Sequence, residues 1–428
     1  MKSKFQKLKE EEIGQKISMW DVFNISILML NNVTSKWVAY LPAFSNPGND
    51  AYTNFEIDLN LSKTEYGVLS GVTFAIISGV FAIIAGIIVD RFSRKWTLFI
   101  TSALWASLTI AQSFATDFVT LLIPRILMEI AVTFVGSVGM SIITDYFCEK
   151  YRARASSIFM LGLYVGVAGS SLAIILVNNI GWRNTYRLIG GISFIITFLT
   201  LFMREPQRGV WNNQAKNEEM KILNRSGSMI SRYFNESKIV VSNPLFLLLC
   251  AAASLRFFGG YALGFWSSKF FEKQFPSFQT EFSIINALTV LLLGVPAQYL
   301  GGYLSDIYAD TKPQVKAFLG GIGALISFPF AVIVFAISTN FWISMSANTI
   351  SYFPAEMWIG PVYVILLDIF PSEIVGTATA IFSLAGGIAG ALSNILLGIL
   401  GDHFDTEENP QVAGYLLTGC IAISYLGC

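Results

Sequence analysis

The chain has 428 residues, of which 54% are hydrophobic and 13% are charged, and its mean hydropathy is +0.59. Soluble domains carry about 25% charged residues, so most of the outer surface of this chain must face lipid rather than water. The 28 basic residues balance the 28 acidic ones, and there are only one His and four Cys. These values exclude a soluble enzyme, a DNA-binding protein and a disulfide-rich secreted module, and they argue against a metal centre.

The first 17 residues are charged and amphipathic, and we interpret them as a cytosolic tail without a cleaved signal. Twelve apolar stretches follow, and each is close to the 20 residues that a helix needs to cross a bilayer. Charged or turn-rich breaks separate them. The predicted spans are 18–42, 64–89, 95–115, 118–146, 155–180, 186–203, 243–268, 280–304, 315–338, 341–370, 374–400 and 412–428.

A polar stretch rich in Asn, Ser, Lys and Glu divides the twelve spans into two sets of six. The predicted fold class is therefore an all-α polytopic membrane protein with two six-helix halves. The predicted divisions are a tail (1–17), an N-terminal half (18–203), a cytosolic linker (204–242) and a C-terminal half (243–428).

The distribution of Lys and Arg predicts the orientation of the chain in the membrane. Of the 28 basic residues, 20 lie in the tail, the linker and the loops on the same side, and six lie on the opposite side. Cytosolic loops carry an excess of Lys and Arg, so both termini are expected to be cytosolic. The remaining two, Arg125 and Arg256, fall at membrane depth.

Arg125 and Glu129 form an i,i+4 pair on one face of the span 118–146. A charge at the bilayer centre costs about 2.5–3.5 kcal/mol on insertion scales, so it should face the bundle interior and have a partner. We expect Arg125 to attract a phosphate or carboxylate group of the substrate. Glu129 is expected either to pair with Arg125 until the substrate binds or to exchange a proton. The alternative is an ion pair that only helps to assemble the bundle.

Arg256 has no acidic residue within one turn, and Gly259 and Gly260 follow it. Two glycines favour a break in this helix, and broken helices at the midplane often form substrate sites. With Tyr261 nearby, Arg256 suits an anionic amphiphile through charge and cation–π contact; the alternative is an arginine that reaches the membrane interface. Glu356 in the span 341–370 is the other candidate titrating acid and completes the predicted substrate-binding set.

A motif recurs at the same place in both halves. Residues 86–95 read Gly86-Ile-Ile-Val-Asp90-Arg91-Phe-Ser-Arg94-Lys95, and residues 301–306 read Gly301-Gly302-Tyr-Leu-Ser-Asp306. The first resembles the signature loop of the major facilitator superfamily, and the second is similar to its degenerate copy. The alternative is a basic loop that merely obeys the topology rule.

The resemblance implies a gating role for these residues. Gly86 is expected to let two helices approach closely, and Asp90 to meet the positive N-terminus of the eleventh span, which begins near Ser372. Arg91 and Arg94 are expected to pair with acids at other inner helix ends, with Asp145 as a candidate. Such ion pairs would hold the cytosolic face closed while the transporter is open outward, and they would break when it opens inward.

A narrower similarity, to Spinster-type transporters, covers about a quarter of the chain. It rests on residues 90–95, Trp105, Arg125, Thr144-Asp145-Tyr-Phe147, Ser157-Ile158-Phe159, Gly162, Gly166, Gly169, Trp182-Arg183-x-x-Tyr186-Arg187 and Glu205-Pro206-Gln-Arg208-Gly209. The family implies export or transfer of lysophospholipids, sphingoid phosphates or similar amphiphiles, often coupled to protons. The family has an Asp-Arg pair where this chain has residues 31–35, and a glutamate where it has Val132.

The sequence thus predicts a transporter that works by alternating access, without catalytic residues or a cofactor, and with a small-molecule or lipid substrate, membrane lipids and protons as partners. Two alternatives stay open: a facilitator for a small polar organic anion, and a non-transporting receptor or structural subunit that kept the fold. The lysosomal or vacuolar membrane and the plasma membrane are both compatible with the sequence.

Overall fold

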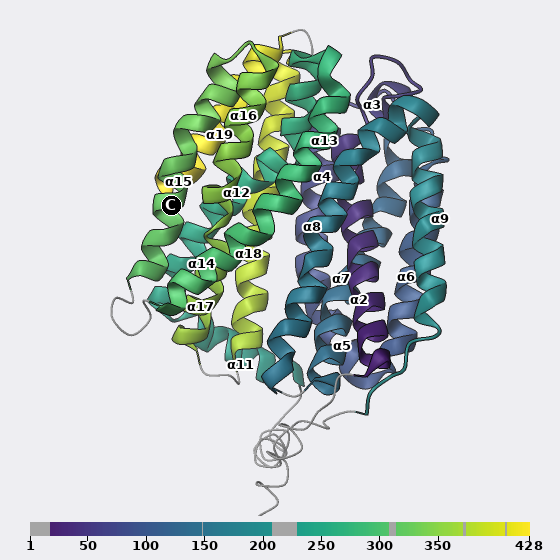
Figure 1. Cartoon of the computed structure of the whole chain (residues 1–428), viewed down its shortest axis with the longest axis vertical. Helices are drawn as coiled ribbons and strands as arrows, with labels where there is room; N and C mark the ends of the chain where they lie inside the picture. Colours follow the sequence, from purple (N-terminus) through teal and green to yellow (C-terminus); the bar gives the residue numbers. More distant parts are fainter. Residues whose placement is uncertain (1–17, 148, 208–228, 308–313, 371–373, 407–408) are drawn as a thin grey trace, which may run out of the picture.

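A computed structural model describes residues 18–147, 149–207, 229–307, 314–370, 374–406 and 409–428. Every regular element in these ranges is a helix, and most of the long helices run side by side (Figure 1). By length and composition, six helices of the described part are long and apolar enough to cross a membrane. They are Phe118–Tyr146, Arg154–Ile180, Pro244–Gln274, Pro276–Ser305, Val315–Ile337 and Gly376–His403.

The helices of the first half follow the predicted order of spans. They are α2 (Met19–Tyr40), η1 (Leu41–Phe44), α3 (Phe55–Asp58), α4 (Lys63–Gly71), η2 (Val72–Ile77), α5 (Ser78–Arg91), α6 (Arg94–Gln112), α7 (Phe118–Tyr146), α8 (Glu149–Ile180) and α9 (Trp182–Thr200). The predicted span 64–89 corresponds to α4, η2 and α5 together, with η2 a π-helical segment.

Helix α11 (Met229–Val241) precedes the second half. That half consists of α12 (Pro244–Gln274), η3 (Pro276–Phe278), α13 (Gln279–Thr289), η4 (Val290–Gly294), α14 (Val295–Ile307), α15 (Val315–Val332), η5 (Ile333–Ile337), α16 (Phe341–Glu356), α17 (Ile359–Ile369), α18 (Val375–His403) and α19 (Pro410–Gly427). The exact limits of tail, linker and halves stay a prediction.

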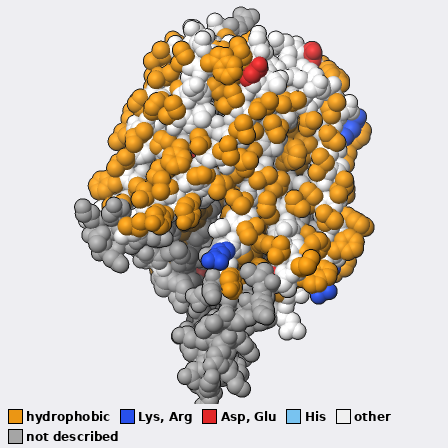
Figure 2. Space-filling view, in the orientation of Figure 1, with side chains coloured by type: hydrophobic (Ala, Val, Ile, Leu, Met, Phe, Trp, Pro, Cys, Tyr) orange, Lys and Arg blue, Asp and Glu red, His pale blue; other side chains and the backbone are white. Residues whose placement is uncertain are grey.

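The bundle has two ends, which we name by their elements. The α3 end carries η1, α3 and the starts of α4 and α19; the linker end carries α11 and the starts of α6 and α12 (Figure 1). Hydrophobic side chains cover most of the face between the two ends, and few charged ones interrupt them (Figure 2). This is the surface that a lipid environment requires.

Side-chain caps fix where several of the helices begin. Ser18 and Asp21 form a capping box at the start of α2, and Ser62 and Glu65 form another at the start of α4. At the start of α12, Asn243 accepts hydrogen bonds from two backbone N–H groups. Each cap satisfies N–H groups that have no partner inside the helix.

The predicted break in the span 243–268 is wrong, because α12 continues through Gly259 and Gly260. A Cβ on Gly259 would lie 2.5 Å from the Ser424 side chain, so this glycine allows α12 to approach α19. The break lies instead in the predicted span 341–370, between α16 and α17. Gly301 allows α14 to approach this break closely, because a Cβ added to Gly301 would lie 2.1 Å from the carbonyl oxygen of Met357.

The halves pack through α4 against α18 and through α8 against α13. A Cβ on Gly67 would lie 2.5 Å from the carbonyl oxygen of Asn394, and one on Gly71 would lie 2.8 Å from that of Ala391. By contrast, a Cβ on Gly86 would meet nothing within 4 Å. The expectation that Gly86 mediates a close helix contact is therefore wrong for this conformation, because the close contact is made nearer the α3 end.

Candidate functional site

Arg125 lies inside the first half with a relative exposure of 1%. Its Nη1 donates to the carbonyl oxygen of Val38 at 2.9 Å, and its Nη2 donates to that of Ala39. Both carbonyls belong to the last turn of α2, where carbonyl groups lack helical partners and the helix dipole is negative. Arg125 therefore caps the C-terminal end of α2 as well as carrying charge at bilayer depth.

Glu129 is the ion-pair partner of this arginine, with 3.2 Å between Glu129 Oε1 and Arg125 Nη2. It is also 1% exposed, and apart from the side chain of Ser78 its carboxylate has no hydrogen-bond donor among the described residues. Lys36 of α2 acts on the same carboxylate electrostatically. Glu129 is thus a buried acid held by charge rather than by a full set of hydrogen bonds.

Arg256 of α12 has a corresponding position in the second half. It is 6% exposed, and its Nη2 donates to the carbonyl oxygen of Ala355, the penultimate residue of α16, at 2.5 Å. Its guanidinium lies over the rings of Tyr425 at 4.4 Å and Trp358 at 5.5 Å. Its Nε and Nη1 have no hydrogen-bond partner among the described residues.

Each half therefore places a buried arginine at the end of a helix with an acid close by. Glu356 follows Ala355 directly and interacts electrostatically with Arg256. Tyr40, the last residue of α2, stacks on Phe265 of α12 at 5.3 Å. The charges of Glu129 and Glu356 both act on Tyr40.

Tyr261, the fifth predicted substrate-binding residue, packs one turn beyond Arg256. Its ring lies 6.3 Å from Phe257 and 6.5 Å from Phe265, and it interacts electrostatically with Glu129. The structure thus brings the five predicted residues into two neighbouring clusters that aromatic rings connect. Their role in binding stays a prediction.

The predicted gating arginine Arg94 is buried at the linker end, with 1% exposure. It pairs with Asp145 of α7, and its backbone N–H donates to Glu205 Oε1 at 2.7 Å. It also donates to the carbonyl oxygens of Ser141 at 3.2 Å and Pro206 at 2.8 Å. Asp145 and Ser141 belong to α7, and Glu205 and Pro206 lie at the start of the predicted linker, so in this conformation Arg94 ties α6 to α7 and to residues 205–206.

The other predicted gating residues are placed less fully. Arg91 is exposed and Lys95 is half-buried, and a Cβ on Gly302 would meet nothing within 4 Å. The side chains of Asp90 and Asp306 lie outside the described residues. The latch between Asp90 and α18 therefore stays a prediction.

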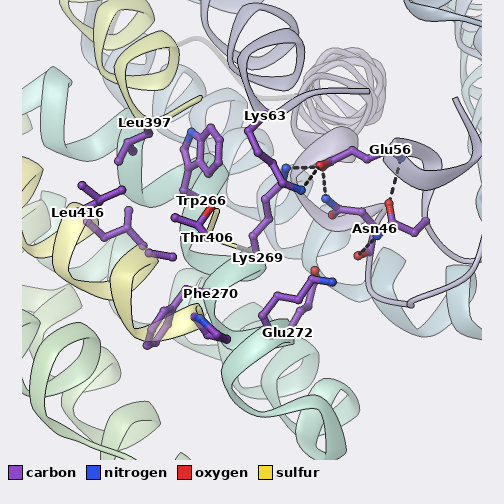
Figure 3. Close-up of a pocket in the computed structure, with 15 residues that line it drawn as sticks. Asn46, Glu56, Lys63, Trp266, Lys269, Phe270, Glu272, Leu397, Thr406 and Leu416 are labelled. Atoms are coloured by element: carbon purple, nitrogen blue, oxygen red, sulfur yellow. Dashed lines mark hydrogen bonds and ion pairs between the residues drawn. The ribbon is translucent and has the colours of Figure 1, made fainter. Parts of the chain in front are cut away.

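A cavity of about 50 Å³ lies at the α3 end, between the two halves. Its lining includes Glu56 of α3, Lys63 of α4 and Lys269 of α12 (Figure 3). Both lysines point at Glu56: Lys63 Nζ lies 2.8 Å from Glu56 Oε2, and Lys269 Nζ pairs with Oε1. Asn46 Nδ2 also donates to Glu56. The cavity wall thus contains an ion pair that joins the halves.

Burial alone would raise the pKa of Glu56, but the charges of Lys269 and Lys63 outweigh burial and lower it to about 2. A carboxyl group whose pKa falls on folding stabilises the folded protein at pH values above its pKa in the unfolded chain, here 4.5. This stabilisation is lost as the pH falls through the lower pKa of the folded state. We therefore expect Glu56→Gln to cost on the order of 3 kcal/mol of stability at pH 5, where Glu56 and both lysines are charged. The cost should shrink between about pH 4.5 and pH 2, which thermal unfolding in detergent at each pH measures.

Sequence reasoning missed this α3-end cluster. It treated Lys63 and Lys269 only as basic residues on the less basic side of the membrane, and it assigned no role to Glu56 or Glu272. Glu272 also lines the cavity, and its Oε1 accepts no hydrogen bond from the described residues. The available signal was two charges within one turn, Lys269 and Glu272, close to the end of an apolar span.

A bundle of long apolar helices with buried charged residues in both halves defines the class of polytopic helical membrane proteins. The family profile "Major Facilitator Superfamily" matches residues 26–394, and the chain belongs to this superfamily.

The predicted Spinster resemblance is confirmed by comparison with known proteins. The chain is 27% identical to protein spinster of Drosophila melanogaster over 328 residues, which cover 73% of this chain and 50% of the fly protein. It is 24% identical to human protein spinster homolog 1 over 400 residues, covering 87% of this chain and 72% of the human one.

Solved structures confirm the fold. A bacterial homologue of the human lysosomal transporter Spinster, in an inward-facing and unoccupied conformation, superposes with a TM-score of 0.79 at 17% identity and covers 96% of both chains. The twelve-helix major facilitator fold with two six-helix halves, expected from the sequence, is thus confirmed, and the protein is a major facilitator transporter that is similar to Spinster proteins.

Proposed function

We propose that this transporter moves an anionic or zwitterionic amphiphile of the lysophospholipid or sphingoid type by alternating access, coupled to protons. The observation that carries the proposal is the state of Arg256. Its guanidinium is buried at bilayer depth, yet Nε and Nη1 donate to no acceptor of the described residues. A buried donor without an acceptor costs about 1–3 kcal/mol, and a phosphate head group is a matching acceptor because its charged oxygens form strong hydrogen bonds with guanidinium N–H groups.

The surroundings of Arg256 suit the apolar part of such a molecule. Trp358 and Phe257 lie with their ring centres 5.2 Å apart, and Tyr425 covers the guanidinium. Aromatic faces stabilise a cation and also accept an acyl or sphingoid chain. The Spinster-type resemblance implies the same class of substrate.

Glu129 is the proposed proton-exchanging group. Arg125 is its ion-pair partner, but Arg125 also donates to the carbonyl oxygens of Val38 and Ala39. Arg125 therefore keeps acceptors when Glu129 is protonated, so a proton can come and go without leaving the arginine unsatisfied.

Flux of a labelled lysophospholipid in proteoliposomes, with and without a pH gradient, tests this function. We expect gradient-driven flux in the unmodified protein, loss of the gradient dependence in Glu129→Gln, and at least about tenfold slower flux in Arg256→Lys, because lysine lacks the planar fork that binds phosphate. Arg187→Lys, a change of an exposed arginine at the α3 end, is the matched control and should transport normally.

Three results would contradict the proposal in different ways. Flux that ignores the gradient in the unmodified protein removes proton exchange and leaves a facilitator. Flux of small organic anions but not of lysolipids assigns Arg256 to a smaller polar substrate. Lysolipid binding without any flux identifies a receptor that kept the fold.

A further inference from the structure

The N-terminus of α4 is capped by a residue from the other half. Asp402, in the last turn of α18, accepts hydrogen bonds from the backbone N–H groups of Lys63 and Thr64, each at 2.8 Å, through different carboxylate oxygens. The Thr64 hydroxyl donates to the same carboxylate. Lys63 and Thr64 are the first two residues of α4, so their N–H groups have no partner inside the helix.

A carboxylate at this position also faces the positive end of the α4 dipole. Ser62, the residue that precedes α4, accepts a hydrogen bond from the backbone N–H of Glu65. The N–H groups of Lys63 and Thr64 are therefore left to Asp402. The start of α4 is therefore completed only while α18 lies against it. This contact joins residues 339 positions apart.

Further contacts between the halves surround this cap at the α3 end. The hydroxyl of Tyr66 donates to the carbonyl oxygen of Phe265 at 2.8 Å, and Ser268 donates to that of Ala43. Lys269 pairs with Glu56. Nearer the middle of the bundle, the hydroxyl of Tyr164 in α8 donates to Gln298 of α14 at 2.9 Å and adds a further polar contact between the halves.

We propose that Asp402 and the first turn of α4 form a lock that holds the α3 end closed and must release each time the transporter opens there. The inference rests on the proposed alternating-access function. Water can replace the carboxylate at both N–H groups when the end opens, so the lock is a modest one. Helix N-caps change equilibria by about 2- to 30-fold, which is small enough to open in every cycle.

The distance between the halves at the α3 end reports the lock directly. Ala51 and Thr339 are exposed there, one in each half, and both can be replaced by spin-labelled cysteine in a chain whose four native cysteines are substituted. Pulsed electron resonance in lipid nanodiscs then gives the ratio of open to closed populations. The full chain is used throughout.

Asp402→Asn is expected to raise the open-to-closed ratio about 2- to 30-fold, because only one acceptor oxygen and no charge remain. Asp405→Asn is the matched control: it removes the same charge three residues later, where the backbone has a φ of 47° that Asn adopts readily. It should change the ratio less than twofold. Thr64→Val removes the hydroxyl donor and should have little additional effect once Asp402 is changed.

Equal ratios in Asp402→Asn and Asp405→Asn would overturn the lock, as would a single closed distance in every variant. Full additivity of Thr64→Val and Asp402→Asn would also overturn it, because residues that share one contact should not act independently. Flux measured on the same preparations separates the two proposals. If Asp402→Asn shifts the open-to-closed ratio but no preparation shows flux, the lock is supported and the transport function is contradicted. If flux is normal and Asp402→Asn leaves the ratio unchanged, the transport function is supported and the lock is contradicted.

Discussion

Replacing Arg125 with methionine is expected to destabilise the protein by about 3–5 kcal/mol, the cost of breaking a buried ion pair by removing one partner. The change leaves Glu129, which is 1% exposed, without its ion-pair partner. It also leaves the carbonyl oxygens of Val38 and Ala39 without the donors that cap α2. The midpoint of thermal unfolding in detergent, with the yield of folded protein, measures the effect.

The second variant in this series is Arg125→Met with Glu129→Gln. Because it removes the uncompensated charge but not the loss of the α2 cap, we expect it to recover part of the stability and not all of it. Glu129→Gln alone should cost less than Arg125→Met. If Arg125→Met unfolds at the same temperature as the unmodified protein, the capping role of Arg125 is wrong.

Gly67→Val is expected to abolish closure of the α3 end and to slow transport by more than tenfold, because a conformational step of the cycle is blocked. Even a Cβ at this position would lie 2.5 Å from the carbonyl oxygen of Asn394 and 3.2 Å from the Cα of Ile395. Backbone atoms cannot move aside as flexible side chains do, so α4 and α18 must separate. Spin labels at positions 51 and 339 should report the open distance.

The control for this change is Gly191→Val in α9, where a Cβ meets nothing within 4 Å. Both changes place the same β-branched residue in a helix, so the loss of helix propensity is matched. Gly191→Val should transport at the normal rate and keep the closed distance. A closed α3 end in Gly67→Val would contradict the packing described for α4 and α18.

The sequence was sufficient to predict features that depend on neighbouring residues. Runs of about 20 apolar residues predicted the spans, since bilayer thickness sets their length. Spacing by four placed Glu129 next to Arg125, because residues at i and i+4 share a helix face. Charge at the ends of spans suggested an ion pair for Arg94, and the structure pairs it with Asp145.

Contacts between distant segments were not predictable in this way. Nothing near Arg125 indicates that it caps α2, 86 residues earlier, because a helical pattern gives the face of a side chain but not its partner. The predicted break at Gly259 and Gly260 was wrong for a related reason. Glycine permits a bend, but here it serves the approach of α12 to α19.

The α3 end shows the same limit most clearly. Glu56, Lys269 and Asp402 come from three separate parts of the chain, and each is an ordinary charged residue at the edge of an apolar stretch. Only the folded arrangement of the halves turns them into a cluster. Sequence patterns report local periodicity, whereas this cluster depends on how α4, α12 and α18 meet.

The cap on α4 also gives a directional meaning to the pairing of α4–α5 with α18. The two segments run antiparallel, so the last turn of α18 meets the first turn of α4 at the α3 end, and the last turn of α5, which contains Asp90, points towards the first turn of α18 at the linker end. The predicted contact of Asp90 with the first turn of α18 would be the counterpart of this cap, because it too places a carboxylate against the positive end of a helix. If both contacts form, closing one end of the paired helices separates the contact at the other end, and the two contacts alternate during the transport cycle.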